Sequence, residues 1–185
     1  EGHVLAVFGG LAGAQDLNEF AVDAFGDHGP AVLHIAGERD YEALRPRVSR
    51  PDYVLLASAE NFGDALAAAD LALSRAGGTV WELAATGTPS ILVPYPHATA
   101  DHQALNAGHF ERGGGAIVVR QPELERVPGL VHELLGDPER LREMGAAMLA
   151  LAKPQAADDI ADELVRLAEG RRATRESVSL GKSSA

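Results

Sequence analysis

The sequence predicts an α/β fold, a Rossmann-like doubly wound parallel sheet, and two observations carry the prediction. Strands buried on both faces, as in parallel sheets covered by helices, are continuous apolar runs and do not alternate. Six such runs occur, at residues 4–10, 31–37, 53–58, 71–77, 90–94 and 115–120. Segments with helical spacing separate them, and a chain that alternates strand and helix is typical of a doubly wound domain.

The helical segments follow from the spacing of apolar residues. Residues 17–24 and 80–87 place small and apolar side chains one helical turn apart, after the first and fourth runs. Three further helices are predicted near the end of the chain, at 124–135, 137–151 and 156–169. The pair Asp137 and Pro138 is a typical helix start, an N-cap residue followed by proline at the first helical position.

The length of 185 residues is natural for one domain, which we expect to cover residues 1–170. Residues 171–185 have few apolar side chains and are predicted to form a flexible tail. Ile160, Leu164 and Leu167 form one apolar stripe, so the helix at 156–169 is expected to dock on another surface. The chain begins with Glu-Gly-His and without an initiator Met, which favours a piece of a longer protein, and the alternative is a processed amino terminus.

Composition restricts the partners. The chain is 46% hydrophobic and 23% charged, as in ordinary globular proteins. Its net charge of -11 repels polyanions, so nucleic acid is not expected as a partner, and any bound phosphate must be held by local donors. The absence of cysteine excludes disulfides and thiolate metal sites. The apolar runs are shorter than the roughly 18 residues that a membrane-spanning helix needs.

In a doubly wound sheet, ligands bind beyond the carboxyl ends of the strands, so the loops there are the candidate site. The first loop, GGLAGA at residues 9–14, places Gly9, Gly10 and Gly13 before a helix. Backbone N–H groups of such a loop can hold an anion at the helix N-terminus. The spacing matches neither the dinucleotide-binding fingerprint nor a Walker A loop, so a simple turn remains an alternative.

The loop after the fourth run repeats this arrangement, with Gly77 and Gly78 ahead of a helix that begins near Thr79. Glu82 then lies in the first turn, where the helix dipole favours its ionised form. A carboxylate there suits the paired hydroxyls of a ribose, and the alternative is a capping box with Thr79. We expect Trp81 to pack against its neighbours, because tryptophan is mostly buried, and the alternative is that it stacks on the ligand.

The loop after the fifth run leads into a helix that either Thr99 or Asp101 is expected to cap. A zinc site formed by His97, His102 and Asp101 is disfavoured, because the histidine spacing matches no common zinc pattern. Polar side chains at a helix start can instead bind sugar hydroxyls through neutral donors and acceptors. The side chains expected to do so are His102, Gln103 and Asn106.

Together, GGLAGA at 9–14, HIAGERDYE at 34–42 and the long segment at 68–107 resemble the carboxyl-terminal half of the MurG family. Members of that family transfer N-acetylglucosamine (GlcNAc) from UDP-GlcNAc to lipid I, which makes lipid II for peptidoglycan. The resemblance covers about Val4 to Glu169. It implies the second of the two Rossmann-like domains of a GT-B glycosyltransferase, the domain that binds the nucleotide sugar.

The resemblance also implies roles for individual residues. Glu82 would bind both ribose hydroxyls, and the backbone near Ala59 would bind the uracil. Thr79 and the first glycine loop would contact the diphosphate, while His102 and Gln103 would reach the sugar. Asn106 would close the adjoining loop. The donor-binding set is Gly10, Leu11, Gly13, Ala59, Gly77, Gly78, Thr79, Glu82, His102, Gln103 and Asn106.

Three positions depart from the family pattern. Leu11 stands where the family has a serine, so only backbone groups would contact phosphate there. The segment at 75–82 is one residue shorter than the family pattern. The positions that match Gly77 and Gly78 in the family can therefore shift by one residue. His102 replaces a glutamine, which could change the sugar preference or add pH dependence near neutrality.

The resemblance implies a longer enzyme, cytoplasmic and peripheral to the inner face of the cell membrane. The acceptor-binding domain, which would supply the catalytic base and meet the lipid-linked acceptor, has no counterpart in these residues. We therefore expect the chain to bind UDP-GlcNAc without catalysis and without metal or other cofactor. The alternatives are another GT-B transferase of UDP-hexoses, for example in glycolipid synthesis, or a stand-alone binding or assembly module that self-associates through residues 156–169.

Overall fold

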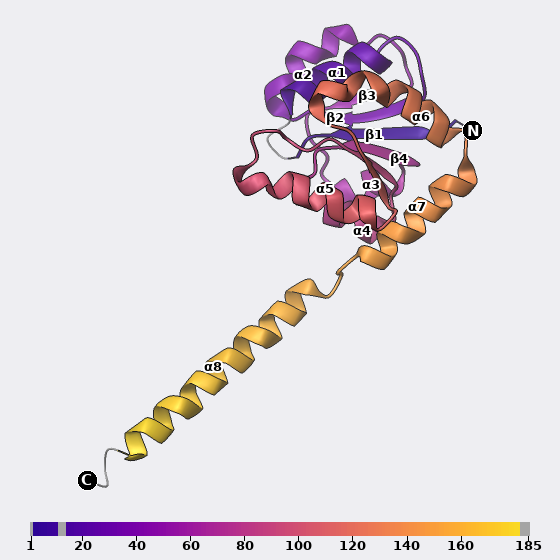
Figure 1. Ribbon diagram of the computed structural model, residues 1–185. Helices are drawn as coiled ribbons and strands as arrows, with labels where there is room; N and C mark the ends of the chain where they lie inside the picture. Colours follow the sequence, from indigo (N-terminus) through magenta and orange to yellow (C-terminus); the bar gives the residue numbers. More distant parts are fainter. Residues whose placement is uncertain (1, 11–13, 182–185) are drawn as a thin grey trace. The chain divides into compact units, whose positions relative to one another are not determined.

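The computed structural model describes residues 2–10 and 14–181 and confirms the predicted fold class. Six parallel strands form one sheet in the order β3-β2-β1-β4-β5-β6 (Figure 1). Every predicted apolar run contains one strand. The strands are β1 (Val4–Phe8), β2 (Ala31–Ile35), β3 (Tyr53–Leu56), β4 (Leu71–Ser74), β5 (Ser90–Leu92) and β6 (Ala116–Val118).

Helices connect the strands and follow the last of them. The α-helices are α1 (Gln15–Phe25), α2 (Glu38–Leu44), α3 (Phe62–Ala67), α4 (Val80–Thr86), α5 (His102–Arg112), α6 (Val127–Leu135), α7 (Pro138–Leu151) and α8 (Ala156–Gly181). Three 3-10 helices are η1 (Arg45–Arg47), η2 (Thr99–Asp101) and η3 (Gln121–Arg126). Connections between parallel strands need such crossovers, because each strand must start again at the same edge of the sheet.

Successive strand residues point to opposite faces of the sheet, and each face has its own hydrophobic core. Leu5 and Val7 of β1 pack with residues of α1 and α6, whereas Ala6 and Phe8 pack with residues of α4 and α5. Helices α1, α2 and α6 accordingly lie on one side of the sheet and α3, α4 and α5 on the other (Figure 1). This double burial explains why the strands appear in the sequence as continuous apolar runs.

Helix α7 contributes to both cores and packs closely on α4. Met144 belongs to the first core and Met148 to the second. Gly87 ends α4 in the left-handed conformation, with φ of 68°. A Cβ on Gly145 of α7 would lie 2.7 Å from the Gly87 carbonyl oxygen, so both glycines allow the close approach of the two helices.

Two helices differ from their predicted bounds. The segment predicted as a helix over 124–135 is 3-10 helix as far as Arg126 and α-helix from Val127 onward. Helix α8 continues to Gly181, beyond the predicted end at residue 169, so part of the predicted tail is helical. That residues 171–185 are mobile stays a prediction.

The chain divides into two compact units, Glu1–Ala152 and Lys153–Ala185. Helix α8 lies in the second unit, with Ile160, Leu164, Val165 and Leu167 exposed on its surface. The predicted nucleotide-sugar domain at 1–170 would include part of both units, and its action as one domain stays a prediction. None of the described helices is both long enough and apolar enough to cross a membrane.

Candidate nucleotide-sugar site

A polar cleft of about 380 Å³ lies at the carboxyl edge of the sheet. Gly9 follows β1, Arg75 follows β4, and Arg39 and Tyr95 lie in the segments that follow β2 and β5. The carboxyl ends of parallel strands share one edge, and ligands of doubly wound folds bind at this edge. The residues that line the cleft are Gly9, Ala14, Gln15, Asp16, Arg39, Arg75, Tyr95 and Gln103.

Side chains of α5 join the loops that follow β4 and β5. The Asn106 side-chain amide donates a hydrogen bond to the Ala76 carbonyl over 3.0 Å. The backbone N–H of Tyr95 donates to Gln103 Oε1 over 2.9 Å. A Cβ on Gly77 would lie 3.9 Å from Gln103 Nε2. The structure therefore brings the two predicted loops together, with Asn106 in the position of a residue that closes the adjoining loop.

Helix α4 begins as predicted, with Thr79 at the N-cap and Glu82 in the first turn. The Thr79 side chain makes no capping hydrogen bond, so the capping box is not formed, and the Glu82 side chain is exposed to solvent. Trp81 packs edge-on against Phe110 of α5, with 5.1 Å between ring centroids. Trp81 packs on its neighbours as predicted, but 39% of it is exposed, so the burial on which the prediction rested is incomplete.

The start of α5 differs from the prediction, because neither the Thr99 nor the Asp101 side chain caps it. Ala100 and Asp101 both have φ of 52°, which turns the chain tightly before the helix. His102 Nδ1 instead lies 2.8 Å from the Thr99 carbonyl oxygen. A carbonyl oxygen only accepts, so Nδ1 carries the proton and the exposed His102 can present Nε2 to a ligand.

The remaining predicted positions lie in two other loops. Gly10 has φ of 94° and is exposed, as a residue of a tight anion-binding loop should be. A Cβ on Gly9 would lie 2.6 Å from Ala14 N, so the loop closes too tightly for a larger residue. Leu11 and Gly13 lie outside the described residues. Ala59 lies between β3 and α3, and Phe62 at the start of α3 contacts Phe8 at the carboxyl end of β1.

Arg75 is a cleft residue that sequence reasoning missed. It is only 5% exposed, its Nη1 donates to the Val93 carbonyl over 3.3 Å, and its guanidinium lies 5.5 Å from the centre of the Tyr95 ring. Burial lowers the pKa of Arg75, and the negative charge of Asp16 partly offsets the effect. One feature of the sequence indicates a role for Arg75, because it lies directly after a buried strand and before two glycines. A charged group buried there needs a partner.

A buried polar network lies behind the cleft, between α1, β2 and α2. The Asn18 amide donates to the Ala36 carbonyl and to Asp40 Oδ2, both over 2.8 Å. Asn18 Oδ1 must then accept from His34 Nε2 over 3.0 Å, so His34 Nδ1 accepts from the Tyr53 hydroxyl over 2.8 Å. Burial lowers the pKa of His34 to about 4, so this histidine is neutral near pH 7.

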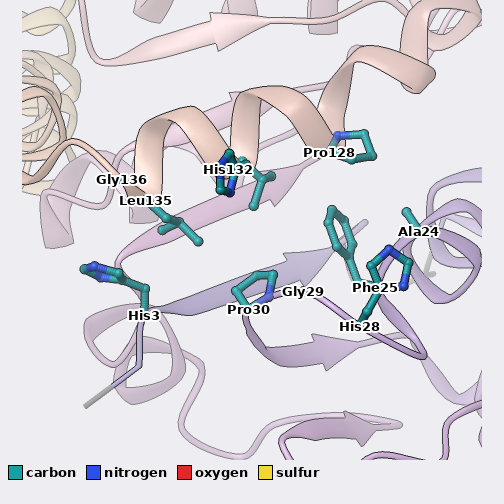
Figure 2. Close-up of a pocket in the computed structure, with 11 residues that line it drawn as sticks. His3, Ala24, Phe25, His28, Gly29, Pro30, Pro128, His132, Leu135 and Gly136 are labelled. Carbon is teal, nitrogen blue, oxygen red and sulfur yellow. The ribbon is translucent and has the colours of Figure 1, made fainter.

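A second cavity, of about 540 Å³, lies at the amino edge of the sheet (Figure 2). His3, His28 and His132 lie around it together with apolar residues such as Phe25 and Leu135. Within the described parts of the chain, no group of three or more His, Cys, Asp or Glu residues is placed to hold a metal ion. No motif in the sequence predicts a site at this edge.

The strand order and the polar cleft at the carboxyl edge define a Rossmann-like domain of the kind found in GT-B glycosyltransferases. The chain belongs to the glycosyltransferase family 28 C-terminal domain family, whose pattern it matches over residues 4–164. The crystal structure of Acinetobacter baumannii MurG superimposes with a TM-score of 0.80 at 27% identity, over 90% of this chain and 52% of that one.

Two curated relatives are named as N-acetylglucosamine transferases that act on UDP-N-acetylglucosamine and N-acetylmuramyl-(pentapeptide) pyrophosphoryl-undecaprenol. The protein from Nostoc punctiforme is 40% identical over 169 residues, which are 88% of this chain and 46% of the relative. The protein from Rubrobacter xylanophilus is 39% identical over 177 residues, or 92% of this chain and 51% of the relative. The chain thus spans about half the length of the curated relatives it matches.

Proposed function

We propose that this chain is the donor-binding half of an inverting N-acetylglucosaminyltransferase and binds UDP-GlcNAc in the cleft at the carboxyl edge of the sheet. The observation that carries the proposal is the convergence of the loops after β1, β4 and β5 on one cleft. Gln103 and Asn106 of α5 bind the segments after β5 and β4. The relatives named as GlcNAc transferases favour this donor over other UDP-hexoses.

In the proposed complex, Glu82 accepts hydrogen bonds from the ribose hydroxyls and the backbone near Ala59 binds the uracil. Thr79, Gly77, Gly78 and the loop with Gly10, Leu11 and Gly13 surround the diphosphate. His102 and Gln103 bind the sugar hydroxyls. The N-terminus of α1 and the buried Arg75 supply positive potential for the diphosphate, so we propose that no metal is required.

Transfer to an acceptor needs a base that activates the acceptor hydroxyl. We assign no catalytic residue to this chain and propose that an acceptor-binding partner domain supplies the base. Lipid I would be the acceptor, and the assembled enzyme would act at the cytoplasmic face of the membrane to make lipid II. The isolated chain should bind UDP-GlcNAc without transferring the sugar.

Titration calorimetry with UDP and 2'-deoxy-UDP tests the site directly. Wild type should bind UDP more tightly, because Glu82 can bond both ribose hydroxyls only in UDP. Glu82→Ala should weaken UDP binding by about 1 to 3 kcal/mol and reduce the difference between the two nucleotides. Glu143→Ala, which removes an exposed carboxylate from α7, is the matched control. An unchanged UDP affinity in Glu82→Ala would contradict the assignment.

The donor sugar and the metal are tested in the same assay. UDP-GlcNAc should compete with bound UDP more effectively than UDP-glucose or UDP-galactose does. Addition of a chelator should leave the affinity for UDP-GlcNAc unchanged. Stronger competition by UDP-glucose would favour a different hexosyltransferase, and loss of binding with the chelator would contradict the metal-free site.

A further inference from the structure

Arg39 lines the cleft, but neither its sequence context nor its family resemblance gave it a role. We propose that Arg39 binds the diphosphate of the donor, an assignment that rests on the proposed function. Asp40, which Asn18 holds in place, positions the Arg39 guanidinium. The assignment adds a side-chain ligand from the segment after β2 to the backbone groups of the first glycine loop. Arg39 would thus recognise the diphosphate and not the uracil, the ribose or the sugar.

The geometry of the Arg39 side chain leaves its outer donors free. Arg39 Nε donates to Asp40 Oδ1 over 2.7 Å, and Arg39 Nη2 donates to Asp40 Oδ2 over 2.8 Å. A guanidinium has five N–H groups, and this two-point contact uses two of them on one side of the fork. Among the described residues the other three have no hydrogen-bond partner and can face a ligand, and the side chain is 56% exposed.

Asp40 is a rigid support for this arginine. Its side chain is 11% exposed, and Asn18 donates to the same Oδ2 that Arg39 Nη2 contacts. Asn18 is itself fully buried and fixed by the Ala36 carbonyl and His34. The hydrogen bond from Arg39 keeps the pKa of Asp40 below its usual value, so the carboxylate stays charged at neutral pH. A guanidinium fixed in this way loses little conformational entropy when a ligand binds.

Two guanidinium groups line the cleft and can donate hydrogen bonds to an anionic ligand. Two guanidinium groups, of Arg39 and Arg75, face one carboxylate, that of Asp16. The Asp16 carboxylate already accepts a hydrogen bond from Gln121 Nε2 over 2.6 Å. Together with Asp40, which pairs with Arg39 behind the cleft, the two arginines and two carboxylates balance, so the cleft is locally less acidic than a chain with a net charge of -11. Sugar hydroxyls need no guanidinium, whereas phosphate oxygens match its fork.

A comparison of UDP with uridine isolates the contribution of the diphosphate, because both ligands share the base and the ribose. Arg39→Gln should weaken UDP binding about tenfold and leave uridine binding unchanged, as expected for one charge-assisted contact at a half-exposed site. Arg39→Lys should recover part of the loss, since lysine restores the charge without the fork. Arg142→Gln is the matched control, because Arg142 is an exposed arginine of α7 that also pairs with a neighbouring carboxylate, that of Glu139.

Asp40→Asn tests the positioning role. This variant should also weaken UDP binding without affecting uridine, and the double variant with Arg39→Gln should lose no more than Arg39→Gln alone. Additive losses would contradict positioning through Arg39. If wild type binds UDP, the diphosphate assignment would be overturned by either of two results. Arg39→Gln could weaken the binding of UDP and of uridine equally, or it could weaken neither. Failure of wild type to bind UDP would instead reject the proposed function itself.

Discussion

The buried histidine of the network predicts a specific pH dependence of stability. His34 is fully buried and neutral in the folded chain, where its pKa is lowered to about 4 because burial disfavours the charged form. In the unfolded chain the same side chain titrates near its ordinary value of 6.5. Below pH 6.5 the unfolded chain binds a proton at His34, whereas in the folded chain His34 stays neutral until the pH approaches 4. The contribution of neutral, buried His34 to the free energy of unfolding is therefore fully present above pH 6.5 and is lost as the pH falls toward 4.

The difference between these pKa values sets the magnitude. A fall to about pH 5 should lower the free energy of unfolding by about 2 kcal/mol through His34, and the loss approaches about 3 kcal/mol near pH 4. Asp40 does not cancel this change, because its pKa lies below the usual value and its own contribution is lost only at still lower pH. His34→Gln cannot titrate, so it should lack this part of the pH dependence.

Urea unfolding followed by Trp81 fluorescence, at about pH 7.5 and about pH 5, measures the effect. Trp81 packs on Phe110 in the first compact unit, so its emission reports the unfolding of that unit. The loss of stability between the two pH values should be about 2 kcal/mol smaller in His34→Gln than in wild type. His28→Gln, which changes an exposed histidine, should behave as wild type. Equal losses in wild type and His34→Gln would refute the argument that a neutral histidine is buried in the network.

Three further predictions concern packing and loop closure. Gly145→Ala should lower the free energy of unfolding by about 1 to 3 kcal/mol, because its Cβ would meet the Gly87 carbonyl at 2.7 Å, and urea unfolding checks this. Gly129→Ala in α6 is its control: no atom lies within 4 Å of the added Cβ, so stability should rise by up to about 1 kcal/mol. Met148→Ala, at a fully buried position, should cost about 2 to 5 kcal/mol in the same assay. Asn106→Ala should weaken UDP-GlcNAc binding several-fold in calorimetry, roughly as expected for one lost hydrogen bond, because the Ala76 carbonyl loses its donor. An unchanged affinity for UDP-GlcNAc would contradict a role of Asn106 in closing the loop.

The sheet could be predicted from the sequence because burial on both faces leaves a local pattern. Each strand of the central sheet is a short apolar run, and the helix starts at Thr79 and Pro138 carry local signals of their own. The start of α5 was not predictable in the same way. Thr99 and Asp101 are favourable cap residues, but the positive φ angles at Ala100 and Asp101 depend on the surrounding loop and not on residue type.

The candidate site was predicted in part, for a similar physical reason. Gln103 and Asn106 were found because polar residues at a helix start near a strand end are visible in the sequence. Arg39 and Asp40 were not, because their significance depends on Asn18, which lies 22 residues from Asp40 and meets it only when α1 and α2 pack together. Arg75 was missed because its burial follows from the positions of Val93 and Pro94 in the folded chain.

Amide chemical shifts of the isotope-labelled chain, recorded while UDP-GlcNAc is added, show at which edge of the sheet the nucleotide sugar binds. If it binds at the carboxyl edge, the largest changes should occur at Gly10, Gly77, Thr79 and Gln103. Absence of changes, or changes centred on the opposite cavity around His28 and Leu135 (Figure 2), would contradict binding at the carboxyl edge.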